Sequence, residues 1–108
     1  MAVPALMLAV VSALAVSGVA ALAQGVVPVD ALRLERLVAQ DCGSCHGLTR
    51  KGGLGLPLTP EALAHAEPEG LALIILDGVP GTAMPRWRPI MTDAEAMWIA
   101  EYLLKDSK

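Results

Sequence analysis

The sequence predicts an all-α fold of about four helices and two long loops. No segment alternates between apolar and polar residues, so the pattern of a half-buried strand is missing along the chain. Helix caps precede several apolar segments, whereas residues 47–57 and 79–91 are rich in glycine or proline. We therefore expect one helical domain, because a chain of 108 residues rarely divides into two cores.

Each expected helix carries a start or stop signal at one end. Asp30, Thr59 and Thr92 are suited to cap helix N-termini, and Glu95 follows Thr92 at the spacing of a capping box. Gly78 is placed to end the third helix. We expect helices over residues 30–40, 59–67, 68–77 and 92–104. Their expected apolar faces are Leu34, Leu37 and Val38, then Leu71, Ile74, Ile75 and Leu76, and finally Trp98, Ile99, Tyr102 and Leu103.

The first 23 residues have the features of an export leader. They contain no charge and end in Ala21-Leu22-Ala23, a small-x-small sequence suited to signal peptidase. We expect a signal peptide over 1–23 with cleavage after Ala23, a linker over 24–29 and a folded domain over 30–108. Unlike most signal peptides, the segment has no Lys or Arg before the apolar run. An uncleaved membrane anchor is the alternative, because about 20 apolar residues can span a bilayer. Both interpretations place the rest of the chain outside the cytoplasm.

The composition argues against nucleic-acid binding and indicates that side chains alone do not fill the core. The 8 basic and 11 acidic side chains give a net charge of −3, which argues against general nucleic-acid binding. The chain has two Trp, one Tyr and no Phe, which is few aromatic residues for a core of this size. Small domains usually need a disulfide, a metal or a cofactor in addition. We expect something other than side chains to fill part of the interior.

Residues 42–46, Cys-Gly-Ser-Cys-His, have the spacing of a site for covalent attachment of c-type haem. Cys42 and Cys45 stand one helical turn apart, so each thiol can reach one vinyl group of the haem. His46 then projects toward the iron. We expect one covalently attached haem c, with Cys42 and Cys45 as thioethers and His46 as the proximal metal ligand.

Three other interpretations of this motif are weaker. A thioredoxin-like dithiol needs a strand–helix–strand context that this sequence does not predict. A zinc site needs four ligands, and His65 is the one histidine besides His46. A disulfide between Cys42 and Cys45 would close a very short loop and would constrain the chain little.

The second axial ligand is expected to be Met84. This residue lies in the proline-rich loop, next to Pro85, where a fixed backbone can hold a thioether on iron. The alternatives are Met91 beside the last helix, Met97 within it, His65 after a short helix, and an open iron. A His/Met pair raises the reduction potential and fills the coordination sphere, which predicts one-electron transfer.

Taken in order, these motifs resemble the class I monohaem cytochromes c over about residues 30–104. Segment 78–87, Gly-Val-Pro-Gly-Thr-Ala-Met-Pro-Arg-Trp, is similar to the small NirC-type cytochromes of denitrification clusters. The resemblance implies the class I cytochrome c fold. It also implies that the carbonyl of Pro57 accepts a hydrogen bond from the ring N–H of His46, which fixes the orientation of the imidazole.

The same resemblance implies a close crossing of the first and last helices. Tyr102 fits the aromatic position at this contact, and Trp98 lies one turn before it on the same face. Leu34 and Val38 stand where the family often has a glycine and an aromatic residue. The distance between the two helices is left open.

The resemblance to the NirC type implies a periplasmic electron carrier, not an enzyme, that donates electrons to cytochrome cd type nitrite reductase. An accessory cytochrome in the biosynthesis or assembly of d-type haem is the alternative. A ligand-binding haem sensor is a more distant one, and it would require that Met84 does not ligate the iron. No permanent membrane span is expected if the leader is cleaved.

Basic side chains gather in the two long loops. Arg50 and Lys51 lie in the first loop, Arg86 and Arg88 lie in the second, and neither loop contains an acid. We expect these residues to border an exposed haem edge and to attract an acidic redox partner. Alternatively, Arg86 or the ring N–H of Trp87 contacts the haem propionates.

Overall fold

The computed structural model describes residues 28–105, and the elements in this range are all helical. The predicted leader and most of the predicted linker lie outside the described residues. Among residues 28–105, no helix has the length and apolar character needed to cross a membrane. In chain order, the elements are α1 (Ala31–Leu37), the π-helix η1 (Val38–Cys42), α2 (Gly43–His46), α3 (Pro68–Asp77), the 3-10 helix η2 (Arg88–Ile90) and α4 (Asp93–Leu104).

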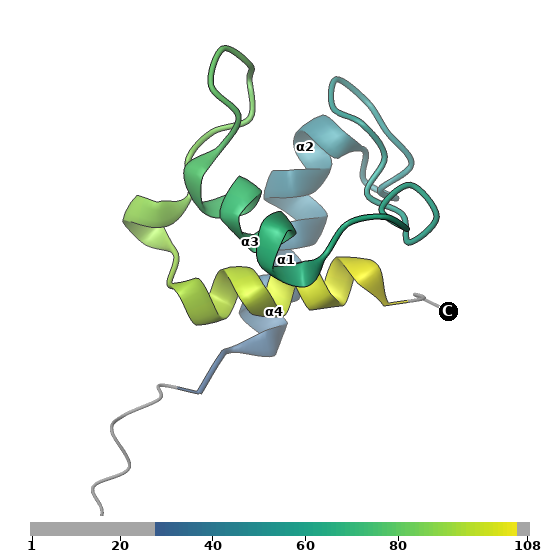
Figure 1. Ribbon diagram of the computed structural model, residues 1–108. Coiled ribbons are helices and arrows are strands. Elements are labelled where there is room, and N and C mark those ends of the chain that lie inside the picture. Colours follow the sequence, from purple (N-terminus) through teal and green to yellow (C-terminus); the bar gives the residue numbers. More distant parts are fainter. Residues whose placement is uncertain (1–27, 106–108) are drawn as a thin grey trace, which may run out of the picture.

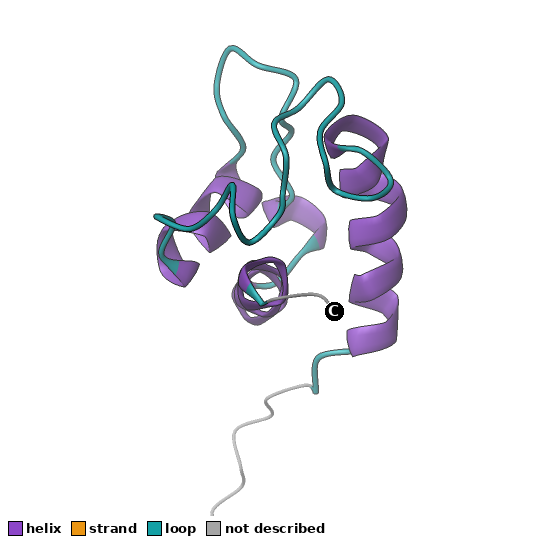
Figure 2. Cartoon of the chain, turned by 90° about the vertical axis from the view of Figure 1, so that its right-hand side faces the viewer, coloured by secondary structure: helices purple, strands orange, loops and turns teal. Residues whose placement is uncertain are grey.

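The first three elements follow one another directly as a single helical rod, which stands upright at the right of Figure 2. Asp30 caps this rod as predicted, because its carboxylate accepts the backbone N–H of Arg33 at 3.0 Å. The predicted end near Gln40 is wrong, since the helical backbone continues to His46. The residues after Gln40 are poor helix formers, so local propensity underestimates the rod that tertiary contacts stabilise.

The predicted short helix over residues 59–67 is also wrong, because this segment forms turns. Its cap exists, since Thr59 Oγ1 accepts the backbone N–H of Ala62 at 3.2 Å. Glu67, however, is extended, with φ −91° and ψ 144°, as expected of a residue that precedes a proline. Fewer than two helical turns are left between Pro60 and Glu67, which is too short for a stable helix.

The predictions for α3 and α4 are confirmed. α3 begins at Pro68 and ends at Asp77, where Gly78 adopts a φ of +67°. Thr92 and Glu95 form the complete capping box of α4. The backbone N–H of Glu95 donates to Thr92 Oγ1 at 3.1 Å, and the backbone N–H of Thr92 donates to a Glu95 carboxylate oxygen at 3.0 Å.

The core lies where α4 packs beside α3 and crosses the rod, and both long loops rise on one side of α4 (Figures 1 and 2). Most of the predicted apolar faces are buried, but Ile74 is 48% exposed and its predicted burial is wrong. Ile74 lies outside the buried face of α3, which consists of Leu71, Ala72, Ile75 and Leu76. The buried core consists of Leu34, Val38, Leu71, Ala72, Ile75, Leu76, Met91, Ala96, Ile99, Ala100 and Leu103.

The contact between α1 and α4 follows the predicted pattern. Leu34 and Val38 are buried on the rod, and on α4 the Trp98 and Tyr102 rings stack with centroids 5.0 Å apart. An ion pair between Arg33 and Glu95 joins the two helices at the surface. Tyr102 of α4 lines the same pocket as Glu35 and Val38 of the rod, where aliphatic residues stand in place of a glycine and an aromatic residue.

We expect Leu34→Ala to lower the free energy of unfolding by about 2–5 kcal/mol, because it opens a cavity at the fully buried helix crossing. Leu32→Ala on the same helix is the matched control, since Leu32 is 66% exposed. Denaturant unfolding of both variants tests this prediction. Similar losses in the two variants would contradict the assignment of Leu34 to the core.

Candidate functional site

The imidazole of His46 is held by one hydrogen bond to the backbone. Its Nδ1 lies 2.7 Å from the carbonyl oxygen of Leu56. A carbonyl oxygen can only accept, so Nδ1 carries the proton and donates it to Leu56. This bond selects the tautomer in which Nε2 keeps its lone pair and can coordinate a metal ion.

The acceptor of this bond is Leu56, so the prediction that the Pro57 carbonyl accepts the His46 N–H is wrong by one residue. Pro57 affects the site differently, because a proline restricts the residue before it to extended conformations. Leu56 is therefore limited in the directions in which its carbonyl can point. The Leu56-Pro57 dipeptide was visible in the sequence, but only the fold shows which of its two carbonyls faces the imidazole.

The glycine-rich loop packs against the C-terminal end of the rod. The backbone N–H of Gly52 donates to the carbonyl of His46, and that of Gly55 donates to the carbonyl of Cys45, each at 2.8 Å. These bonds satisfy carbonyls that a helix end leaves without partners. A Cβ at Gly55 would lie 2.6 Å from His46 Nδ1, so no larger residue fits beside the ring.

Cys42 and Cys45 lie in the last turns of the rod, where both are half-buried and no disulfide joins them. Burial, together with the nearby carboxylate of Asp41, raises the pKa of the Cys42 thiol to about 11. The spacing of the two thiols on one helical segment fits two thioether bonds to one planar group, as predicted.

The part of the chain that the structure describes contains no cluster of three His, Cys, Asp or Glu side chains arranged for a metal ion. The exposed apolar side chains test whether these residues fit a haem. Large apolar side chains are exposed on the loop that holds His46 and on α3, although apolar surface of this extent is normally covered. Leu54 is 93% exposed and Leu56 is 81% exposed. Further exposed side chains of this kind are Leu48, Leu73, Ile74, Val79 and Ile90.

These exposed side chains lie next to the C-x-x-C-H turn in the sequence or on the elements that border the second long loop. Together with the two thiols and the Nε2 of His46, they provide what a covalently bound, apolar macrocycle with a central iron requires. The residues present therefore fit a haem c.

The second long loop presents Met84 on a closed backbone turn. The backbone N–H of Val79 donates to the carbonyl of Met84 at 3.3 Å, and the Thr82 hydroxyl donates to the carbonyl of Val79 at 2.7 Å. The backbone N–H of Met84 donates in turn to Thr82 Oγ1 at 3.2 Å. Gly78 allows this closure, because a Cβ there would lie 2.7 Å from the Met84 carbonyl oxygen.

The structure distinguishes Met84 from the other candidates for the second axial position. Met91 is 6% exposed and belongs to the apolar core. Met97 is partly buried against the same core, and His65 is exposed in the turns before α3. Met84 is half-buried in the loop that faces the same side of the molecule as the first loop (Figure 1).

Trp87 and Arg86, the predicted contacts of the haem propionates, lie where the second loop returns to α3. The Trp87 side chain packs against the core, and its backbone N–H donates to the carbonyl of Leu76 at 3.1 Å. Arg86 is exposed. Their contact with a propionate stays a prediction.

The expected basic border of the site is weaker than the sequence indicates. Arg88 forms a bidentate ion pair with Asp77, at 2.8 and 2.9 Å, and reaches Asp93 at 3.2 Å. Hydrogen bonding to Arg88 holds the pKa of Asp77 below its ordinary value of 3.8. The charge of Arg88 is thus balanced within the chain, and the prediction that Arg88 faces an acidic partner loses its basis.

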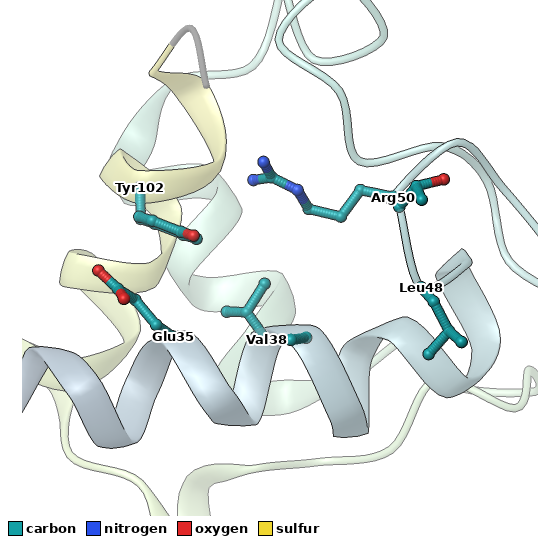
Figure 3. Close-up of a pocket in the computed structure, with 7 residues that line it drawn as sticks. Glu35, Val38, Leu48, Arg50 and Tyr102 are labelled. Carbon is teal, nitrogen blue, oxygen red and sulfur yellow. The ribbon is translucent and has the colours of Figure 1, made fainter. Parts of the chain in front are cut away.

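Arg50 stands at a different place from the one predicted for it. Its guanidinium carbon lies 5.3 Å from the centroid of the Tyr102 ring, a cation–π contact at the corner of the first loop and α4. Figure 3 shows Arg50 and Tyr102 on opposite sides of a pocket of about 240 Å³, with Glu35 and Val38 on the rod below. The pocket is smaller than the roughly 300–1,000 Å³ usual for ligand sites, and none of the C-x-x-C-H residues lines it.

Comparisons with known proteins agree with this geometry. A family model described as cytochrome c oxidase, cbb3-type, subunit III matches residues 29–103. Cytochrome c55X of Paracoccus denitrificans is 60% identical over 81 residues, which make up 72% of this chain and 79% of that protein.

Two solved structures are also similar. The c-type cytochrome NirC has a TM-score of 0.66 and 45% identity, and the match covers 68% of this chain and 86% of that one. The dihydro-heme d1 dehydrogenase NirN, in complex with DHE, has a TM-score of 0.63 and 37% identity, and the match covers 68% of this chain but only 16% of that one. This chain therefore matches nearly the whole of NirC and a small part of NirN.

We expect Gly55→Ala to lower the free energy of unfolding by about 1–3 kcal/mol, because the added methyl group overlaps the His46 ring. Gly70→Ala is the matched control, since a Cβ there meets nothing within 4 Å. In that helical position alanine should stabilise the protein by about 0.5–1 kcal/mol. Thermal or denaturant unfolding measures both, and a Gly55→Ala variant as stable as the wild type would contradict the close packing of loop and ring.

We expect the Asp77–Arg88 pair to stabilise the protein at neutral pH and to lose this effect in acid. The pKa of Asp77 is lower in the folded protein than in the unfolded chain, so the contribution is present above the ordinary pKa and is lost as the pH falls below 3.8. Asp77→Asn should therefore be less stable than the wild type at pH 7 and equally stable in strong acid. Thermal unfolding as a function of pH tests this, and a difference that persists in acid would contradict it.

Proposed function

Because this chain belongs to the family of small c-type cytochromes, which includes the cytochromes c55X, we propose that it is a periplasmic carrier of single electrons. Members of this family hold one covalently attached haem c. In the proposal, Cys42 and Cys45 form the thioethers and His46 is the proximal ligand. Residues 1–23 are a leader that is cleaved after Ala23.

The observation that carries the proposal is the His46 hydrogen bond to the Leu56 carbonyl within a C-x-x-C-H turn. It orients the imidazole and leaves Nε2 as the one ring nitrogen that can donate to iron. When bound, the haem takes up and releases one electron as its iron changes between the ferric and ferrous states. The short rod and the packed glycine loop keep the ligand fixed through that change.

We place Met84 at the second axial position. The closed turn around Val79 and Thr82 restricts the backbone on which Met84 lies. A neutral thioether opposite an imidazole raises the reduction potential and leaves no coordination site for a substrate. This ligand set supports a carrier rather than an enzyme or a ligand-binding sensor.

The proposed partner is cytochrome cd type nitrite reductase, to which the protein donates electrons. The similarity to NirC supports a small, separate cytochrome of denitrification. A second candidate function is supported by the similarity to NirN, which is described as a dihydro-heme d1 dehydrogenase. On that basis, the protein instead exchanges electrons with the machinery that makes or inserts d-type haem.

The proposed docking surface lies on the two long loops. Lys51 and Arg86 are both exposed there, whereas Arg88 is balanced by Asp77 and Asp93. A positive charge at the haem border attracts an acidic partner, and salt shortens the range of this attraction. Lys51 and Arg86 are therefore the residues to test.

We expect the reduced protein to be reoxidised rapidly by oxidised cytochrome cd type nitrite reductase, at a rate that falls with ionic strength. Lys51→Glu and Arg86→Glu should each slow this reaction at low salt, by about twofold to tenfold, and the difference should shrink at high salt. Arg36→Glu, the same charge change on α1 rather than on a long loop, should have little effect. Stopped-flow absorbance measures these rates.

Slow reoxidation by this enzyme would reject the role of direct donor and favour the second candidate function. Equal effects of Arg36→Glu and Lys51→Glu would keep the donor role but reject docking through the long loops. The two results are therefore separable.

A further inference from the structure

The loop that carries Met84 leaves the end of α3 and returns to it. Asp77 is the last residue of α3, and Asp93 is the first residue of α4. Arg88 lies between them and contacts both. Its Nε and Nη2 donate to the two carboxylate oxygens of Asp77 at 2.8 and 2.9 Å, and its Nη1 donates to Asp93 at 3.2 Å.

This base of the loop also contains a main-chain contact. The backbone N–H of Trp87, the residue before Arg88, donates to the carbonyls of Ile75 and Leu76 at 3.3 and 3.1 Å. The Trp87 and Arg88 contacts together fix the returning segment on the C-terminal turn of α3. Arg88 adds a side-chain bond in which a planar guanidinium matches a carboxylate at two points.

The part of the loop beyond this base has little burial to hold it. Residues 79–83 are exposed, and Met84 itself is only half-buried. A segment with few buried contacts opens locally at a low free-energy cost, independently of global unfolding. The position of Met84 therefore depends on how firmly the base of the loop stays closed.

We infer that Arg88 is a positioning residue, which keeps the Met84 loop closed and so keeps the Met84 thioether on the iron. This inference rests on the proposed function, in which Met84 is the second axial ligand. Arg88 touches neither ligand nor haem in this scheme. It acts by joining Asp77 and Asp93 across the base of the loop.

The test measures how fast imidazole replaces Met84 in the oxidised holoprotein, because replacement requires the loop to open. Arg88→Gln should speed replacement by about twofold to fivefold, as expected for loss of an exposed but bidentate ion pair. Arg88→Lys keeps the charge but not the two-point geometry, so its rate of imidazole replacement should lie between those of Arg88→Gln and the wild type. Asp77→Asn, which leaves the contact between Arg88 and Asp93, should speed replacement no more than Arg88→Gln does, and the double variant should be no faster than Arg88→Gln.

Arg33→Gln is the matched control. It also removes an arginine from an exposed ion pair, with Glu95, but that pair joins α1 to α4 and includes no residue of α3 or of the Met84 loop. Imidazole replacement in this variant should proceed at the wild-type rate. Denaturant unfolding of both variants should give similar, small losses, which separates local opening from global stability.

Two results would overturn the inference. The first is an Arg88→Gln variant that binds imidazole at the wild-type rate, or no faster than Arg33→Gln. It counts when Met84→Ala has lost the sulfur-to-iron charge-transfer absorption that the wild type shows. In that case Met84 is the ligand and the proposed function stands without a role for Arg88. The second is a wild type whose absorption and imidazole binding are the same as those of Met84→Ala, which rejects the ligand assignment and the inference with it.

Discussion

The hydrogen bond from His46 Nδ1 to the Leu56 carbonyl is the interaction on which the site depends. It requires the helical rod to extend to His46, the glycine loop to turn back over the rod, and Gly55 to leave room beside the ring. Each of these conditions restricts the conformations of the chain. Together they leave Nε2 with its lone pair free for a metal ion.

The remainder of the fold supports this arrangement with a small aliphatic core. Leu34 and Ile99 are fully buried where α4 packs, whereas the three aromatic side chains lie at the border of the core. Large apolar side chains that are exposed to solvent are found on the first loop and α3. A domain of this size gains much from a covalently bound apolar group, because its own side chains bury too little surface.

The two long loops have different constraints, and this difference bears on function. The first loop is fixed by backbone hydrogen bonds to the end of the rod. The second is fixed at its base, by Trp87 and Arg88, and within itself by Thr82. One face of the site is therefore rigid, while the face that bears Met84 depends on a few polar contacts. We assign the charge of Arg88 to this closure, whereas the exposed residues Lys51 and Arg86 belong to the proposed docking surface.

The sequence by itself determined the features that arise from neighbouring residues. These include the capping box at Thr92, the bounds of α3, the C-x-x-C-H turn and its cofactor class, because caps, prolines and motif spacing act within a few residues. Only the tertiary structure decided that Leu56 and not Pro57 accepts the His46 proton, and that Arg88 pairs with Asp77. Those contacts join residues ten or eleven positions apart through irregular loops, whose path depends on packing rather than on local propensity. The extent of the rod beyond Gln40 was not predicted because its last carbonyls are paired by the N–H groups of Gly52 and Gly55, which lie in the irregular loop that follows.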